Sequence, residues 1–324
     1  MIPSLRVADT EGITEAPASE TDAMPTTPPR VREDLTFPSG DEHCAAWLYA
    51  PAGDSPFPVI VMAHGLGGTK SMRLDAFAER FQAAGYASLV FDYRHFGDSP
   101  GQPRHIIDVP KQLEDWNAAL RFARTDSRFD PRRIAVWGTS FGGGHAIATA
   151  AANPDVAAAI AQCPFTDGLA SSLAVPPLTS LKITAKAIAD AVGARLGRDP
   201  IYVPVAGKPG DTALMVAPDA LPGMLALQPP DAEFHNEAAA RIALQLIRYF
   251  PGRRAIDVKA PLLVCICDPD TVAPAGPTQK HIAKAPQGEI KHYAYGHFDI
   301  YVGDPFEQVV GDQIAFLRAH IPTN

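Results

Sequence analysis

Residues 133–144 read RIAVWGTSFGGG, and the fold class follows from this short sequence because its pattern changes halfway along. The first half is an apolar run typical of a buried strand, and the second half begins a helical pattern. Between them stands Gly138-Thr-Ser140-Phe-Gly142, a Gly-x-Ser-x-Gly sequence. Serine at an abrupt strand-to-helix turn is held in a strained backbone conformation, and the flanking glycines let strand and helix approach closely. The motif therefore predicts a projecting serine at the carboxyl edge of a sheet.

Apolar runs alternate with helical patterns on both sides of this motif, which is typical of strand-helix-strand units and a largely parallel sheet. The class is α/β. The first two strands have no helix between them and should form an antiparallel hairpin. The predicted strands are Asp34–Pro38, His43–Tyr49, Pro58–Ala63, Ala87–Asp92, Arg133–Gly138, Val156–Cys163, Pro261–Cys267 and Glu289–Tyr293, and the predicted helices are Ser71–Ala84, Val109–Thr125, Pro277–Ala285 and Pro305–His320.

Three regions are expected along the chain. Residues 1–31 are rich in proline and acidic residues without apolar periodicity, which predicts a flexible N-terminal arm. Residues 32–166 and 256–324 form the α/β core. The intervening residues 167–255 are too long for a structureless loop inside a compact domain, so they predict a helical cap. Its helices are expected at Leu178–Leu196 and Asn236–Tyr249, and its apolar residues Leu214, Met215, Met224, Leu225 and Leu227 are candidates either to line a pocket or to pack the cap onto the core.

Composition excludes several classes of function. A chain of 324 residues with 46% hydrophobic residues is globular, and its net charge of −8 gives no drive toward nucleic acid or an anionic membrane. No run of about 18 to 20 apolar residues and no signal peptide is present, so we expect a soluble, cytoplasmic protein. The four cysteines are not spaced like a disulfide framework or a zinc site, which predicts buried thiols and no metal.

A serine hydroxyl is a weak nucleophile at neutral pH, so the motif demands a base and an acid to orient that base. His297 follows the last strand, at the same sheet edge as Ser140, and is the predicted base. Asp270 follows the strand Pro261–Cys267 and is the predicted acid. Asp167 and Asp268 remain alternatives, because each also follows a strand at that edge.

Attack by serine on a carbonyl creates an oxyanion, which backbone N–H groups must stabilise. One donor is expected from Phe141, directly after the serine. The second is expected from the loop His64–Gly68, with the Leu66 N–H as our choice and Gly65 as the alternative. The same glycines would also suit an ordinary tight turn.

These motifs, in this order, resemble the α/β-hydrolase superfamily over Glu33–Pro322. The resemblance implies an eight-stranded, mostly parallel sheet flanked by helices, with a helical cap inserted after the sixth strand, and no cofactor. The segments Cys163–Gly168 and Gly296–Tyr301 are similar to a branch related to dienelactone hydrolases and X-prolyl peptidases. That branch includes polyketide transferases and lactonases that open the macrolactone zearalenone.

The resemblance implies a small-molecule ester, thioester or lactone as substrate. We predict hydrolysis of a carboxylic ester or lactone of a bulky apolar molecule, such as a zearalenone-like macrolactone, through an acyl-enzyme. The alternatives are an acyl or polyketide transferase or thioesterase with the same residues, and a non-catalytic ligand-binding protein on this scaffold. An arm as long as residues 1–31 could reach a neighbouring subunit, so a homo-oligomer is also an expectation.

Overall fold

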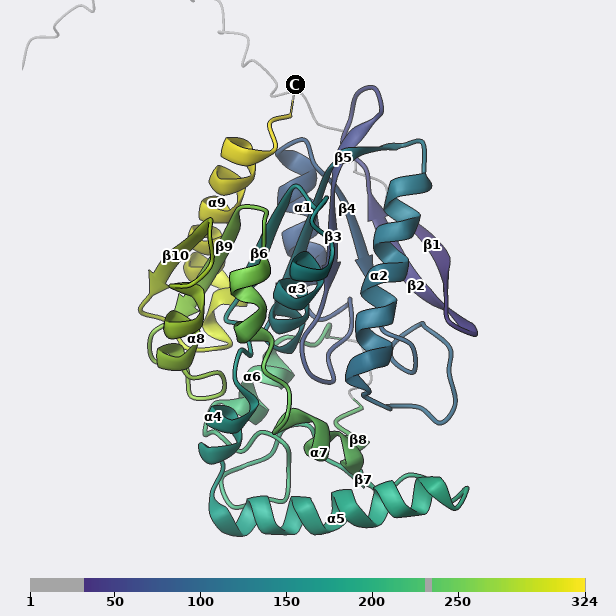
Figure 1. Cartoon of the computed structure of the whole chain (residues 1–324), viewed down its shortest axis with the longest axis vertical. Helices are drawn as coiled ribbons and strands as arrows, with labels where there is room; N and C mark the ends of the chain where they lie inside the picture. The colour runs from purple at the N-terminus through teal and green to yellow at the C-terminus, as the bar shows by residue number, and fades with distance from the viewer. Residues whose placement is uncertain (1–31, 231–234, 324) are drawn as a thin grey trace, which may run out of the picture. The chain divides into compact units, whose positions relative to one another are not determined.

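An eight-stranded sheet runs through the computed structural model, which describes residues 32–230 and 235–323 (Figure 1). The strand order is β1-β2-β4-β3-β5-β6-β9-β10. β2 pairs antiparallel with β1 and with β4, and the other neighbours pair in parallel. The bounds are β1 Arg32–Ser39, β2 Glu42–Tyr49, β3 Phe57–Ala63, β4 Ala87–Phe91, β5 Phe129–Thr139, β6 Ala158–Gln162, β9 Leu262–Cys267 and β10 Gly288–Tyr293. The predicted sheet and its hairpin are confirmed, whereas the predicted arm at residues 1–31 lies outside the described residues.

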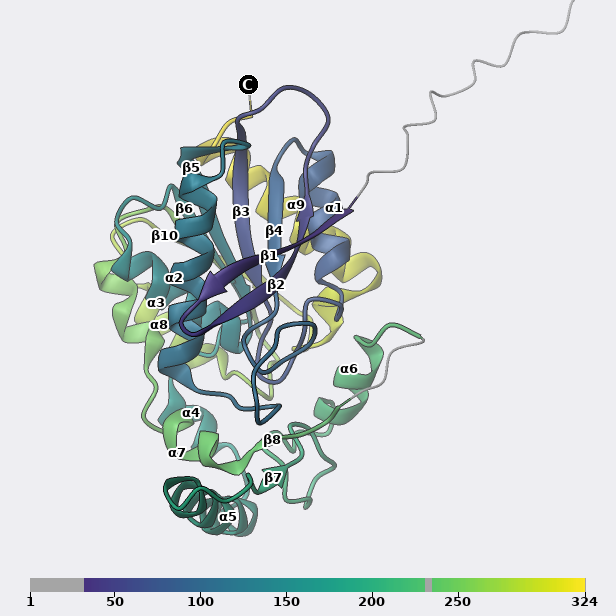
Figure 2. The same cartoon turned by 90° about the vertical axis from the view of Figure 1, so that its right-hand side faces the viewer.

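Helices cover both faces of the sheet. Figures 1 and 2 show α1 and α9 on one face and α2, α3 and α8 on the other. This layering is expected because parallel strands buried on both faces must be connected by helices that cross over the sheet. The helix bounds are α1 Leu74–Ala83, α2 Val109–Thr125, α3 Phe141–Ala152, α8 Ala275–Ile282 and α9 Gly303–His320.

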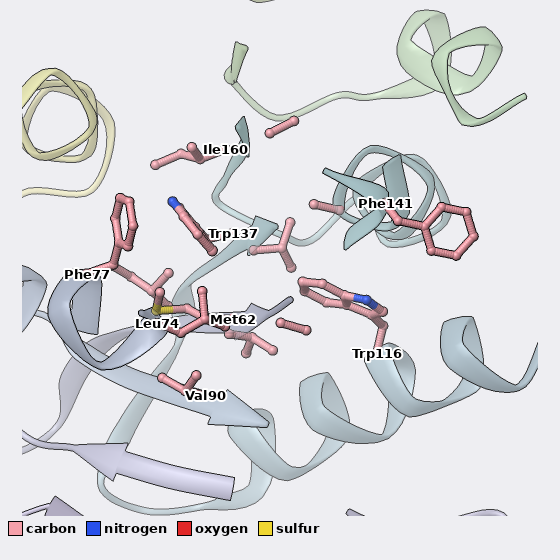
Figure 3. Close-up of a cluster of buried hydrophobic side chains, with 14 of the residues drawn as sticks. Met62, Leu74, Phe77, Val90, Trp116, Trp137, Phe141 and Ile160 are labelled. Atoms are coloured by element: carbon pink, nitrogen blue, oxygen red, sulfur yellow. The ribbon is translucent and has the colours of Figure 1, made fainter. Parts of the chain in front are cut away.

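Aromatic side chains fill the core between the sheet and its helices. Phe77 of α1 and Trp137 of β5 lie side by side, with ring centroids 5.0 Å apart (Figure 3). The Trp137 indole N–H, which needs a partner when buried, donates to Gln313 of α9 at 2.9 Å. Gln313 donates in turn to Gln162 at 2.8 Å, and Gln162 donates to Thr139 at 3.3 Å. A buried polar chain thus connects α9 to the residue before Ser140.

The segment inserted after β6 lies beyond the carboxyl ends of the parallel strands (Figures 1 and 2). It is mostly helical, as the prediction of a cap after the sixth strand required. Its elements are α4 Gly168–Leu173, α5 Pro177–Arg195, β7 Tyr202–Val203, α6 Ala220–Ala226, β8 Ala238–Ala239, η1 Ala240–Ile242, α7 Ala243–Leu246 and η2 Pro251–Asp257. No helix among the residues placed by the structure is long and apolar enough to cross a membrane.

The predicted helix Asn236–Tyr249 is wrong, because long-range partners replace helical hydrogen bonds there. Ala238–Ala239 forms a short antiparallel pair with Tyr202–Val203. The Asn236 side chain accepts from the Ala206 N–H at 2.9 Å and donates to the Ala206 carbonyl at 2.7 Å. Only the short 3-10 turn η1 and the single turn α7 of the expected helix form. The helical pattern was real, but tertiary contacts overrode it.

Candidate active site

Ser140 stands at the turn between β5 and α3 with a positive φ of 55° and ψ of −120°. The two motif glycines are required by close contacts. A Cβ on Gly138 would lie 2.0 Å from the Gly142 carbonyl oxygen, and a Cβ on Gly142 would lie 2.4 Å from the His64 carbonyl oxygen. Any side chain at either position would push the strand, the helix and the neighbouring loop apart. The strained turn therefore holds the Ser140 hydroxyl at the carboxyl edge of the sheet.

The structure brings Ser140, His297 and Asp270 together. His297 Nδ1 lies 2.6 Å from Asp270 Oδ2, and His297 Nε2 lies 3.0 Å from Ser140 Oγ. A carboxylate only accepts, so Nδ1 carries the proton and Nε2 is free to accept from the serine hydroxyl. The second carboxylate oxygen of Asp270 accepts the N–H groups of Val272 and Ala273 at 2.8 and 2.7 Å. Both oxygens are thus held, and the imidazole is oriented for proton transfer from Ser140.

The electrostatics of His297 suit a base that becomes positively charged. Its side chain is 2% exposed, and burial by itself disfavours the imidazolium. The adjacent Asp270 carboxylate, together with Cys163, outweighs burial and raises the His297 pKa well above its ordinary value of 6.5. The raised pKa means that the site stabilises the protonated ring, which is the form produced when a hydroxyl gives up its proton.

Neither alternative acid reaches His297. Asp268 accepts from His292 at 2.7 Å, and both side chains are about half exposed. Asp167 lies 3.4 Å from His281 and caps α4 by accepting the Ala170 N–H at 3.0 Å. Each of the three candidate aspartates therefore has a histidine partner of its own, and only Asp270 is paired with the histidine that contacts Ser140.

His64 distinguishes between the two N–H groups considered for the oxyanion. His64 Nδ1 accepts from the Gly65 N–H at 2.7 Å, so the Gly65 donor is already used. The ring proton must then be on Nε2, which donates to the Met72 carbonyl at 3.1 Å. Burial lowers the His64 pKa to about 4, so the ring stays neutral and keeps this arrangement. Leu66, the next residue, lines both cavities beside Ser140, whereas Gly65 lines only the smaller one.

A buried ion pair anchors the far end of the same loop. Lys70 Nζ donates to Asp92 at 2.6 Å, and both side chains are less than 4% exposed. Asp92 also accepts the Lys70 N–H at 2.7 Å. Burial raises the Asp92 pKa, although Lys70 opposes the shift, so each charge depends on the other. Asp92, directly after β4, therefore has a structural role.

The sequence prediction did not include a cluster of three residues next to His297, namely Thr139, Cys163 and Tyr301. Cys163 Sγ lies 3.7 Å from Thr139 Oγ1 and 4.0 Å from both the Tyr301 hydroxyl and the His297 carbonyl oxygen. Tyr301 also hydrogen-bonds Thr139. The ligand atoms of Cys163, Asp270 and His297 lie within 4.8 Å of one another, which is close enough to hold a metal ion. Among the sequence signals, only the position of Cys163 directly after β6 could have indicated that this residue lies at the site.

Two cavities meet at Ser140. The larger has a volume of about 400 Å³ and lies between the core and the cap. The smaller has a volume of about 10 Å³ and lies beside His297. Among the cap residues proposed from sequence, Leu214 and Met215 line the larger cavity, and Met215, Met224 and Leu227 line the smaller. Leu225 lines neither and is 51% exposed.

Fold and site together define an α/β-hydrolase, and comparison with known families agrees. The Hydrolase_4 family, described as serine aminopeptidase S33, matches residues 54–301, so the chain belongs to this family. It is 55% identical to the quorum-quenching protein AidA of Acinetobacter baumannii (strain MDR-ZJ06) over 294 residues, covering 91% of this chain and 97% of AidA. The chain is therefore a hydrolase-family protein similar to a quorum-quenching protein.

Fungal proteins are more distant relatives. The chain is 27% identical to the polyketide transferase grgF of a Penicillium species over 298 residues, covering 90% of this chain and 97% of the transferase. The crystal structure of the α/β hydrolase GrgF superposes with a TM-score of 0.78 at 25% identity, covering 90% of this chain and 99% of GrgF. The predicted similarity to polyketide transferases is confirmed.

Proposed function

We propose that the protein is a serine hydrolase that cleaves a carboxylic ester or lactone through an acyl-enzyme. The hydrogen-bonded series from Ser140 through His297 to Asp270 is the observation that carries this proposal. The apolar lining of the larger cavity supports an apolar substrate. The 55% identity to a quorum-quenching protein favours a lactone-type signal molecule as the natural substrate.

In the first half of the reaction, His297 Nε2 removes the Ser140 proton as Oγ attacks the substrate carbonyl carbon. The carbonyl π electrons move to oxygen, and the N–H groups of Phe141 and Leu66 stabilise the resulting oxyanion. When the carbonyl re-forms, the bond to the alcohol oxygen breaks and that oxygen takes the proton from His297. In a lactone the alcohol stays tethered to the acyl group.

In the second half, water gives a proton to His297 and its oxygen attacks the acyl-enzyme. Collapse of the second oxyanion breaks the bond to Ser140 Oγ, which recovers its proton from His297. The Asp270 carboxylate stabilises each imidazolium. Water and residues of this chain supply every group in the scheme, so no cofactor is part of the proposal.

The test is a screen of aryl esters, thioesters, N-acyl-homoserine lactones and macrolactones such as zearalenone, with products identified by mass. We expect Ser140→Ala to lower kcat/KM on any cleaved substrate by roughly 10⁵-fold to 10⁶-fold. The fluorophosphonate-labelled serine should be Ser140. Ester turnover unchanged in Ser140→Ala would refute the proposal, and absence of both labelling and turnover would favour a non-catalytic binding protein.

The second candidate is an acyl transferase, which the polyketide transferase relatives support. It shares the acyl-enzyme and differs only in what attacks it, an alcohol or amine instead of water. Product analysis with and without a candidate acceptor separates the two. Hydrolysis gives the free acid at the same rate in both reactions, whereas transfer gives a new ester or amide only when the acceptor is present.

A further inference from the structure

Ser140 opens onto two spaces of very different size. The larger cavity, about 400 Å³, is lined mainly by apolar side chains of the core and the cap. The smaller, about 10 Å³, admits only a small group. Ser140, Leu66 and Met215 line both cavities. The groups that would attack the carbonyl and stabilise the oxyanion are therefore at the boundary between the two.

His297 lines the smaller cavity and is absent from the lining of the larger one. This position orients the substrate, because the departing alcohol oxygen must take its proton from His297 Nε2. Such a transfer needs the two atoms within about 3 Å of each other. This geometry favours an orientation in which the alcohol part of the substrate points into the smaller cavity and the acyl part occupies the larger.

We propose that the site selects substrates with a long apolar acyl part and a small alcohol part, an inference that rests on the proposed hydrolase function. Met224, Leu227 and Phe298 close the smaller cavity and are at most 8% exposed. A methyl or ethyl ester fits this division. So does a small-ring lactone whose apolar chain is attached beside the carbonyl, because its alcohol arm has only a few atoms. A macrolactone does not fit, because its alcohol arm is long.

The larger cavity has the properties of a binding site for a long acyl group. Its volume lies within the usual range for small-molecule sites, about 300 to 1,000 Å³. Each methylene buried there should raise kcat/KM by up to about fourfold until the cavity is full. Its apolar lining includes Phe165, Val175, Leu214, Val216, Leu246 and Val272.

Two ester series on the full-length protein test the proposal. The first keeps methanol as the alcohol and lengthens the acyl group from acetyl to dodecanoyl. The second keeps a hexanoyl group and lengthens the alcohol from methanol to octanol. We expect kcat/KM to rise along the first series and to fall by more than about tenfold along the second. Equal turnover of methyl and octyl hexanoate would overturn the proposal.

Substitutions in each cavity test which cavity sets the preference for the acyl part and which sets the preference for the alcohol part. Met224→Ala widens the smaller cavity and should restore turnover of octyl hexanoate at least about fivefold relative to methyl hexanoate. Leu227→Val is the milder variant should Met224→Ala fail to fold. Ala174 is an exposed residue that lines only the larger cavity. Ala174→Trp should therefore lower the turnover of methyl dodecanoate, relative to that of methyl acetate, by about tenfold. Leu178→Trp is its control, since Leu178 is 64% exposed and lines neither cavity.

The outcomes separate this inference from the proposed function. If no ester or lactone is cleaved in a Ser140-dependent way, the hydrolase function itself fails. If esters are cleaved but Met224→Ala changes the acyl preference, or leaves the alcohol preference as it was, the function stands and the assignment of the cavities is wrong.

Discussion

Two aspartate–histidine pairs belong to the same two strands, β9 and β10: Asp268 and Asp270 follow β9, His292 lies within β10 and His297 follows it. Asp270 and His297 are 2.6 Å apart and at most 2% exposed, whereas Asp268 and His292 are 2.7 Å apart and 43% and 54% exposed for the histidine and aspartate. In water an ion pair at this distance contributes little, but in a buried site the carboxylate strongly stabilises the imidazolium. His297, the candidate base, is therefore distinguished from His292 by its burial and by its contact with the Ser140 hydroxyl.

The largest predicted difference is between the two histidines. His297→Ala removes the acceptor for the Ser140 proton and should lower kcat/KM by roughly 10⁵-fold or more. His292→Ala changes an exposed side chain and should leave kcat/KM within about twofold of wild type. Steady-state kinetics on the best ester from the screen would measure both. A similar loss in the two variants would mean that the comparison does not identify the base.

The two aspartates should differ less, but still widely. Asp270→Asn keeps the shape of the side chain and removes the charge that fixes the imidazole tautomer, so kcat should fall by about 10³-fold to 10⁴-fold. Asp268→Asn is the matched change in the exposed pair and should alter kcat less than about twofold. Circular dichroism spectra of both variants are needed, so that misfolding is not mistaken for lost orientation. A fully active Asp270→Asn would assign the acid elsewhere.

The smallest predicted effect on activity is a change in how activity depends on pH. Because Asp270 raises the His297 pKa above 6.5, activity should fall as pH decreases through a midpoint above 6.5, where the base becomes protonated. In Asp270→Asn burial is opposed only by the contact with Cys163, so the midpoint of the residual activity should move down. Asp268→Asn should leave the midpoint unchanged. The measurement is kcat/KM between about pH 5 and pH 9.

The same pKa shift has a consequence for stability with a fixed sign. Protonated His297 is favoured by the folded protein, so its contribution to the free energy of unfolding is fully present below pH 6.5. That contribution is lost as the pH rises through the higher pKa of the folded state. Denaturant titrations of wild type and Asp270→Asn across this range would show the difference.

Much of the fold and part of the site could be read from local pattern. The Gly-x-Ser-x-Gly sequence placed Ser140 at a strand-to-helix turn, and the contacts of Gly138 and Gly142 explain why no other residue fits there. The expected helix Leu178–Leu196 forms as α5, one residue earlier at each end. The expected helix Asn236–Tyr249 does not form, because its partners Ala206 and Tyr202–Val203 lie far away in the sequence.

Local pattern specified the strands, the turn at Ser140 and the edge of the sheet where His297 and the three aspartates would gather, because strand and turn preferences act between near neighbours. It favoured Asp270 as the acid, with Asp167 and Asp268 as alternatives, and Leu66 as the N–H donor, with Gly65 as the alternative. In the folded protein, burial and hydrogen-bond partners separate these candidates: Asp270 meets His297 out of water, and His64 accepts the Gly65 N–H. Burial and pairing depend on residues distant in sequence, so no local pattern encodes them.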